Sequence, residues 1–503
     1  MNQPQDKSNT PYDQETIPSA DKKSDIVGKT GRGILWSFLG QGVNKCFTLI
    51  TLMILARLLT KEDFGLVAAA TILITFLAVY QDMGLGNALI QYRGDISRAA
   101  DSVFTMNLMV GIVLTVAVYA VAPLISLYFQ NTAMTPLVRC LGLSFIINAI
   151  GAVHIVLLKK DLNYKKKILP DIGGATVKGI VSIAMAFMGY GVWSLVVGQL
   201  IGATMRVIIV WFVLPWRPKL YVDTTISSRL LKFGGSIMGI DTLSVLTENL
   251  SFIITGKVCG LALLGVFTLS FRLPETLLIS SLWILSGVFY PMFAMLQNEP
   301  EKLRQGFLAS IRLVSLFATP ISLGLFLSAE PLILVLYGDQ WLEAIPILRI
   351  LAIYALVYSV GFHAGDVYKA IGKPNVLLAI SIGGFVIDLV GLLIGAQFGL
   401  KGIASGLLVA ITITNAVSVI IASRLIRVSF RQIFSGCSSA IIGGLVLVVM
   451  VTLAGSLASE YSPSIRLIAM VVPAALAYIC LLWILEKENI LFVIQKVGLL
   501  RTK

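Results

Sequence analysis

Long apolar segments recur along almost the whole chain after residue 33, and short polar connections separate them. A helix of about 20 residues, with a rise of about 1.5 Å per residue, crosses a hydrocarbon core of about 30 Å. This pattern predicts an all-α polytopic membrane protein. We expect about 14 spans, at residues 34–57, 64–81, 102–128, 136–158, 172–189, 192–214, 234–256, 263–293, 307–329, 345–368, 376–397, 401–423, 437–458 and 463–485.

Basic residues gather in alternate connections. The even-numbered connections hold most of them, for example Lys159, Lys160 and Arg217, whereas the odd-numbered connections hold few, such as Lys61 and Lys257. Because basic loops stay on the cytoplasmic side, we expect a multi-pass protein of the cytoplasmic (inner) membrane with both termini in the cytoplasm. Residues 1–32 are polar and carry no apolar core of a signal peptide, so we expect a disordered cytoplasmic tail.

Related segments reappear about 200 residues apart. Arg57 and Gly65 align with Lys257 and Gly265, and PLISLYF at residues 123–129 reappears as PLILVLY at residues 331–337. This spacing predicts two parallel six-helix repeats around a central cavity, followed by two further helices. The expected divisions are a tail at 1–32, a first six-helix bundle at 33–220, a second at 221–431, two additional helices at 432–486 and a cytoplasmic tail at 487–503.

Composition supports the membrane class. The chain is 57% hydrophobic and 13% charged, whereas a soluble domain is about 25% charged. The net charge of +13 reflects the cytoplasmic connections rather than nucleic-acid binding. The five cysteines are scattered, and His154 and His363 lie far apart. We therefore expect no metal site, no cofactor and no catalytic group.

Cations within the expected spans are the first candidates for function. Lys45, next to Asn44, stands about 16 Å from the start of the first span, too deep for its ammonium to reach the nearer interface. A lysine at such a depth costs about 2.5–3.5 kcal/mol, which makes it a functional-site candidate by default. Arg272 and Lys178 lie in the eighth and fifth spans. These residues would suit an anionic head group, so we expect substrate binding at Lys45, Arg272, Lys178 and Asn44.

Acidic residues also occur within the expected spans. Asp241 and Glu248 are seven apart on one face of the seventh span, and Asp388 is the repeat counterpart of Lys178. We regard these three acids as candidates for ion coupling.

Structural interpretations remain open for most of these charges. Lys45 could pair with an acidic residue, Arg272 with Glu275 across Pro274 could stabilise a kink, and Lys178 with Asp388 could interlock helices. Arg206 could snorkel to the cytoplasmic face. A proton site is a further hypothesis for His363 with Asp366.

Three segments carry a resemblance to a known family. They are ARLLTKEDFGL from Ala56, DMGLGNALIQ from Asp82 and EPLILVLYGDQWLEA from Glu330. They resemble the polysaccharide-transport (oligosaccharidyl-lipid flippase) family of the MOP exporter superfamily, and are similar to colanic acid and teichuronic acid exporters. The resemblance implies a flippase that moves undecaprenyl-pyrophosphate-linked oligosaccharide repeat units across the membrane by alternating access, in surface polysaccharide biosynthesis. In lipid-linked members of the superfamily, cations on the first and eighth helices line the cavity, and the resemblance implies this role for Lys45 and Arg272 at comparable places here.

Other functions remain as alternatives. An ion-coupled multidrug or small-molecule antiporter of the same superfamily would use the acidic residues. A membrane polymerase or ligase would need a sizeable outward loop, which we do not expect, and a structural scaffold would not explain so many charges within spans. The implied partners are the lipid-linked oligosaccharide, membrane lipids, a polysaccharide polymerase and glycosyltransferases, and not nucleic acid.

Overall fold

The computed structural model describes residue 40, residues 42–161 and residues 163–487, and helices form nearly all of this part of the chain. A first helix, residues 42–58, is described without its beginning. It is followed by α2 (Lys61–Asp82), α3 (Leu85–Gln91), α4 (Ile96–Phe129), α5 (Met134–Gly142), α6 (Ser144–Lys160), α7 (Tyr164–Phe187), α8 (Val192–Val213), α9 (Thr224–Val258), α10 (Leu261–Pro274), the π-helix η1 (Glu275–Ile279), α11 (Ser280–Met295), α12 (Pro300–Leu327), α13 (Ala329–Leu336), the 3₁₀ helix η2 (Asp339–Trp341), α14 (Ala344–Gly361), α15 (Ala364–Ala370), α16 (Pro374–Ala396), α17 (Gly399–Leu425), α18 (Phe430–Leu457) and α19 (Pro463–Leu485).

Twelve segments of the described chain are long and apolar enough to cross a membrane, so the prediction of a polytopic all-α membrane protein is confirmed. The expected number of about 14 is not reached. The first expected span begins outside the described residues, and the seventh coincides with α9, part of whose side chains lie outside them. Fourteen spans therefore remain a prediction.

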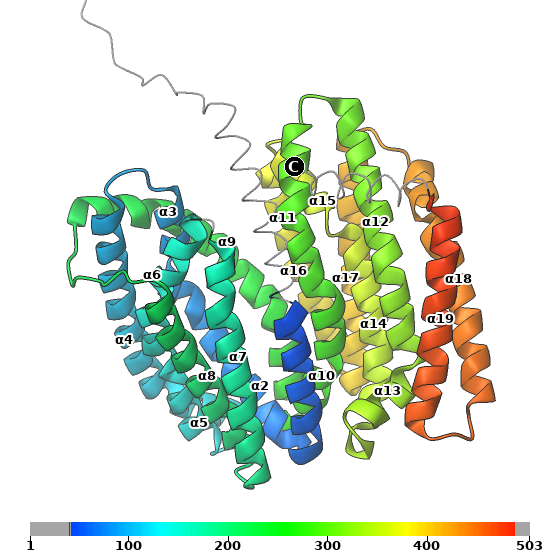
Figure 1. Cartoon of the computed structure of the whole chain (residues 1–503), viewed down its shortest axis with the longest axis horizontal. Coiled ribbons are helices and arrows are strands. Elements are labelled where there is room, and N and C mark those ends of the chain that lie inside the picture. The colour runs from blue at the N-terminus through cyan, green and yellow to red at the C-terminus, as the bar shows by residue number, and fades with distance from the viewer. Residues whose placement is uncertain (1–39, 41, 162, 488–503) are drawn as a thin grey trace, which may run out of the picture.

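The helices form two groups that are joined by α9 (Figure 1). We call α2–α8 the N-terminal lobe and α10–α17 the C-terminal lobe. Helix α9 contacts α2, α3 and α4 of the first lobe and α10, α16 and α17 of the second. Helices α18 and α19 pack against each other and against α12, on the outside of the C-terminal lobe.

The two lobes meet directly where α2 contacts α10 (Figure 1). Helix α2 begins at a capping box, in which the Thr60 side chain accepts from the amide of Asp63 while the Asp63 side chain accepts from the amide of Thr60. One turn later, an added Cβ on Gly65 would lie 1.8 Å from the carbonyl oxygen of Leu261, and one on Gly265 would lie 2.0 Å from that of Lys61. Each residue of one contact has its counterpart 200 positions away in the other, Gly65 with Gly265 and Lys61 with Leu261, as an approximate two-fold axis between two repeats requires.

The largest apolar core lies at this end of the molecule, which we call the α2–α10 end. Leu55 of the first helix and Phe64 of α2 pack there with Ile333 of α13 and Trp341 of η2. Trp341 is fully buried, and its ring contacts the edge of the Phe64 ring. The packing therefore fastens the first helix and α2 to the C-terminal lobe.

Candidate functional site between the two lobes

An exposed ion pair marks a break in the span Leu261–Met295. Pro274 ends α10, and the π-helix η1 follows it at once. The guanidinium of Arg272 lies 3.0 Å from the carboxylate of Glu275, and the two side chains are 42% and 40% exposed. Such π-turns are frequent at functional sites. The pair expected from the sequence is confirmed, and its exposure makes the guanidinium accessible to a ligand as well.

Lys45 connects the first helix to α11. Its Nζ donates to Oγ of Ser281 at 3.0 Å, and Ser281 in turn donates to the carbonyl oxygen of Leu277 at 3.1 Å. The partner is a hydroxyl and not a carboxylate, so this contact does not neutralise the ammonium. The neighbouring Asn44 accepts from Thr48 Oγ1 within the first helix. Among the residues that the structure describes, no acidic side chain forms an ion pair with Lys45, so the alternative of a structural ion pair gains no support there.

Lys178 brings a third cation from the N-terminal lobe. Glycines of α8 let α7 approach closely, since an added Cβ on Gly202 would lie 2.6 Å from Cβ of Lys178. The Lys178 side chain is exposed and lies within electrostatic range of Arg272 in the other lobe. Among the described residues no ion pair joins Lys178 to Asp388, so the interlocking pair expected as an alternative is not seen.

The acidic candidates face the same region. Asp241 and Glu248 of α9 are both exposed, and Glu248 interacts electrostatically with Glu275. Asp388 of α16 is half-buried and lies within electrostatic range of Tyr354 of α14. The structure thus brings Glu248 near the Arg272–Glu275 pair, while Asp241 lies about two turns away, toward the start of α9.

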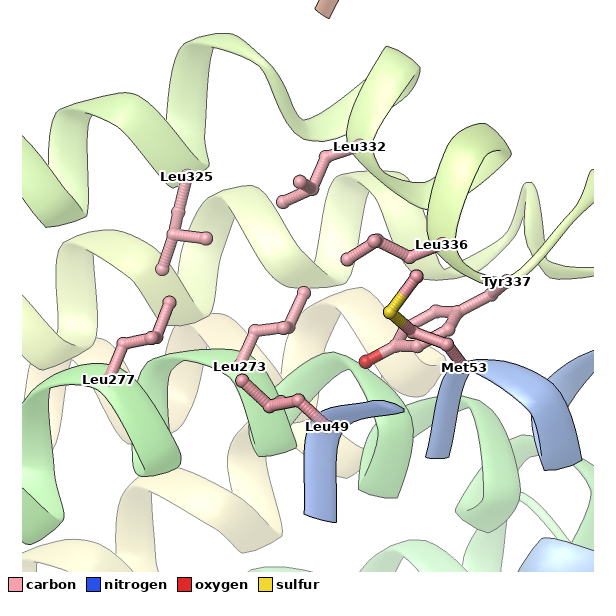
Figure 2. Close-up of a pocket in the computed structure, with 8 residues that line it drawn as sticks. All are labelled: Leu49, Met53, Leu273, Leu277, Leu325, Leu332, Leu336 and Tyr337. Atoms are coloured by element: carbon pink, nitrogen blue, oxygen red, sulfur yellow. The ribbon is translucent and has the colours of Figure 1, made fainter. Parts of the chain in front are cut away.

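An apolar cavity of about 180 Å³ lies near Arg272, which is within electrostatic range of Tyr337 in the cavity lining. Leu49 lies one helical turn after Lys45, and Leu273 and Leu277 belong to the helix that carries Arg272 and Glu275. Figure 2 shows side chains from the first helix, from α10 and η1, and from α12 and α13 pointing into this space. Its lining is Leu49, Met53, Leu273, Leu277, Leu325, Leu332, Leu336 and Tyr337.

Contacts between the lobes are repeated in reciprocal form at the α2–α10 end. Arg57 of the first helix donates to the carbonyl oxygen of Val335 in the C-terminal lobe. Its repeat counterpart Lys257, at the end of α9, donates to that of Tyr128 in the N-terminal lobe at 2.8 Å. Lys61 of α2 also forms an ion pair with Glu343 at 3.0 Å. Arg57 and Lys257 align in the repeats, but this role in contacts between the lobes was not expected from the sequence.

A second charged cluster occupies the N-terminal lobe. Arg206 and Lys167 both pair with Asp171, at 2.8 Å and 3.0 Å. Asp82 lies within electrostatic range of Asp241 and Lys159. Arg206 therefore has an acidic partner, Asp171, and its expected snorkelling to the cytoplasmic face stays a prediction. Asp82 and Asp171 were not among the expected site residues, although the spacing of four between Lys167 and Asp171 was a signal for their pairing.

His363 and Asp366 form a buried pair away from these charges. Nδ1 of His363 lies 2.9 Å from the carboxylate of Asp366, whose other oxygen accepts from Ser286 of α11 at 2.7 Å. Phe289 and Phe362 pack against the imidazole ring. The pair therefore connects α11 to α15, and the proton site expected there remains a hypothesis. In the described part of the chain, no group of three or more His, Cys, Asp or Glu residues could hold a metal ion.

Comparisons with known proteins place the chain in a family. Residues 54–346, more than half of the chain, match the family described as polysaccharide biosynthesis protein. The lipopolysaccharide biosynthesis protein WzxC of Escherichia coli K12 is 23% identical over 408 residues, 80% of this chain and 83% of WzxC. The teichuronic acid biosynthesis protein TuaB of Bacillus subtilis 168 is 26% identical over 336 residues, 66% of this chain and 69% of TuaB.

Solved structures share the fold. The lipid II flippase MurJ in an inward closed conformation superposes with a TM-score of 0.71 at 14% identity, over 91% of this chain and 100% of that one. An inward-facing multidrug resistance MATE transporter of the MOP superfamily gives 0.65 at 16% identity, over 76% and 94%. The chain therefore belongs to the polysaccharide biosynthesis protein family and shares the fold of these flippase and MOP-superfamily transporter structures.

Proposed function

We propose that this transporter moves a lipid-linked oligosaccharide across the cytoplasmic membrane, with an undecaprenyl diphosphate as the carrier. The observation that carries the proposal is the juxtaposition of cations with an apolar cavity. Lys178 from one lobe and Arg272 from the other lie within electrostatic range of each other, and Arg272 adjoins Leu273 in the lining of the cavity. A lipid diphosphate has these two chemical parts, an anion joined to a hydrocarbon chain.

The energetic argument concerns the diphosphate. An unpaired charge in hydrocarbon is costly, about 2.5–3.5 kcal/mol even for one lysine on insertion scales and more for a multiply charged group. Exposed cations in a water-filled site replace the lost hydration through charge-assisted hydrogen bonds. We assign the diphosphate to Lys45, Arg272 and Lys178, with Asn44 beside them, and part of the polyprenyl chain to the apolar cavity.

Alternating access would carry the bound group from one face to the other. With both termini in the cytoplasm, the α2–α10 end lies outside, and the contacts of Arg57 and Lys257 hold it shut. Opening that end requires these contacts to break, while the lobes approach at the cytoplasmic end. No covalent step is needed. A polysaccharide polymerase and glycosyltransferases are the partners we propose.

A second candidate function rests on the acidic residues. Asp241 and Glu248 are exposed on one face of α9, which would suit an organic cation or a coupling ion. In the flippase, we assign ion coupling to these acids together with Asp388. In an antiporter for small molecules, the same acids would bind the substrate itself.

The deciding experiment is a side-resolved assay of lipid-linked oligosaccharides in cells with and without the protein. Accumulation on the cytoplasmic leaflet of the deletion strain would support the flippase. Accumulation on the outer leaflet would indicate a later defect in polymerisation or ligation. If no lipid-linked intermediate accumulates, the small-molecule antiporter becomes the better explanation.

A further inference from the structure

A groove of about 320 Å³ lies between α12, α18 and α19, apart from the charged site. The connection between α18 and α19 is at the same end of the molecule as the α2–α10 contact (Figure 1). Helices α18 and α19, which form two of its walls, lie on the outside of the C-terminal lobe (Figure 1). It is lined by Leu327, Val451, Thr452, Gly455, Ser456, Ser459, Arg466 and Met470.

Arg466 is the cation of this groove. Its Nε is buried and donates to no partner among the described residues. The nearest acid is Glu330 at the start of α13, whose Oε1 lies 3.7 Å from a terminal nitrogen of Arg466, beyond hydrogen-bond distance. A guanidinium has five N–H donors. It therefore retains donors that an anionic oxygen could satisfy.

The hydroxyl groups of the groove offer hydrogen-bond acceptors, whereas Arg466 offers donors. Thr452, Ser456 and Ser459 are exposed, and their hydroxyls donate to carbonyl oxygens of their own segment at 2.7, 2.8 and 2.9 Å. Because each hydroxyl proton is already used, the oxygen lone pairs are what remains for a ligand. Glu330 adds a carboxylate that is 44% exposed. The groove thus presents donors at Arg466 and acceptors around it.

The depth of the groove matches the head-group region of a bilayer. Arg466 is three residues after the start of α19 at Pro463, or about 5 Å along the helix axis. Val451 and Met470, which are buried, and Leu327 form its apolar wall. A ligand held here would place its charged part near water and its hydrocarbon part against this wall.

We propose that this groove binds the head group of a zwitterionic phospholipid that carries a primary ammonium. The phosphate accepts from Arg466, and the ammonium donates to Glu330 and to the hydroxyl oxygens of α18. A quaternary ammonium cannot donate, and a glycerol head group brings no positive charge to Glu330. The site should therefore prefer phosphatidylethanolamine to phosphatidylcholine and to phosphatidylglycerol.

The test is native mass spectrometry of the purified full-length protein, titrated with each of the three lipids. One charge-assisted hydrogen bond corresponds to about a tenfold change in affinity. We expect the first phosphatidylethanolamine to bind about tenfold more tightly than either other lipid. Arg466→Gln should remove most of this binding, and Glu330→Gln should remove the preference over phosphatidylglycerol. Arg431→Gln, an exposed arginine at the opposite end of α18, is the matched control.

The outcomes separate the proposal from unspecific lipid binding. Equal affinity of the wild-type protein for all three lipids would overturn it, as would unchanged selectivity in both variants. Preference for phosphatidylglycerol would show that the phosphate alone is recognised and would overturn the zwitterionic class. If Arg466→Gln does not fold, the selectivity of the wild type and of Glu330→Gln decides.

Discussion

At the scale of single residues, the site depends on charges that have incomplete partners. Lys45 donates to a serine and not to an acid, and the side chains of Arg272 and Glu275 remain about two-fifths exposed although they pair. A pair this exposed contributes only about 0–1 kcal/mol to stability, so stability alone gives little reason for it. The exposed arrangement favours a role in binding.

Lys45→Ala tests this role. Because a charge-assisted hydrogen bond contributes about 1.5–3 kcal/mol, we expect export to fall by about tenfold or more at unchanged protein abundance. Export is measured as surface polysaccharide per cell. Ser281→Ala is the matched control, since it removes the contact of Lys45 but keeps the charge, and it should retain most export. Near-normal export by Lys45→Ala would contradict the assignment.

The acidic residues of α9 permit a separate prediction. If they bind a coupling ion, Asp241→Asn and Glu248→Gln should transport without dependence on an ion gradient, or should lose transport driven by it. The measurement is uptake into inside-out vesicles with and without an imposed gradient. Glu343→Gln, which removes an acid outside the charged site, should keep the dependence. Unchanged dependence in both α9 variants would exclude them as the coupling site.

At the scale of elements, the contact of α2 with α10 depends on two glycines. The carbonyl oxygens of Leu261 and Lys61 occupy the space that side chains at Gly65 and Gly265 would need. Both glycines lie inside regular helix, so the requirement is one of space and not of backbone conformation. Any side chain there would separate the two helices.

Gly65→Leu and Gly265→Leu should therefore open the α2–α10 end. Overpacking of this kind costs about 1–3 kcal/mol, and about 1.4 kcal/mol changes a conformational equilibrium tenfold. We expect faster labelling of a cysteine at Lys61 by a membrane-impermeant thiol reagent, together with reduced export. Gly287→Leu, where no atom lies within 4 Å of the added Cβ, is the control. Labelling rates equal to those of the control would argue against a gate at this contact.

At the scale of the whole molecule, each repeat holds the other at the same end. The first helix reaches the C-terminal lobe through Arg57, and α9 reaches the N-terminal lobe through Lys257. Because the two contacts are related by the repeat, a movement that breaks one is expected to break both. The lobes would then separate as rigid bodies, as in other transporters built from repeats.

Cross-linking at the α2–α10 end tests that movement. With the five native cysteines replaced, Lys61→Cys and Glu343→Cys can be joined by a short reducible thiol cross-linker in place of the ion pair. We expect export to stop when the linker is added and to recover after reduction. Either cysteine alone should be insensitive to the linker. Continued export with the link intact would show that this end need not open.

The membrane class, the approximate spans and the duplication follow from the sequence by itself. They depend on hydropathy and on recurring segments, both of which are present in the order of the residues before any folding, and the structure confirms twelve of the spans. The pairing of Arg272 with Glu275 also followed from a spacing of three residues on one helix.

Only the tertiary structure decided the partners of residues that are distant in the chain. Lys45 meets Ser281 and Lys178 comes near Arg272 because α9 positions two lobes whose contact is set by helix packing. Neither hydropathy nor periodicity encodes which faces of two helices meet. The alignment of the repeats pairs Arg57 with Lys257, but it does not show that both residues contact the other lobe. Their acceptors are backbone carbonyl oxygens. Because every residue has such an oxygen, only the tertiary structure identifies which one is bound.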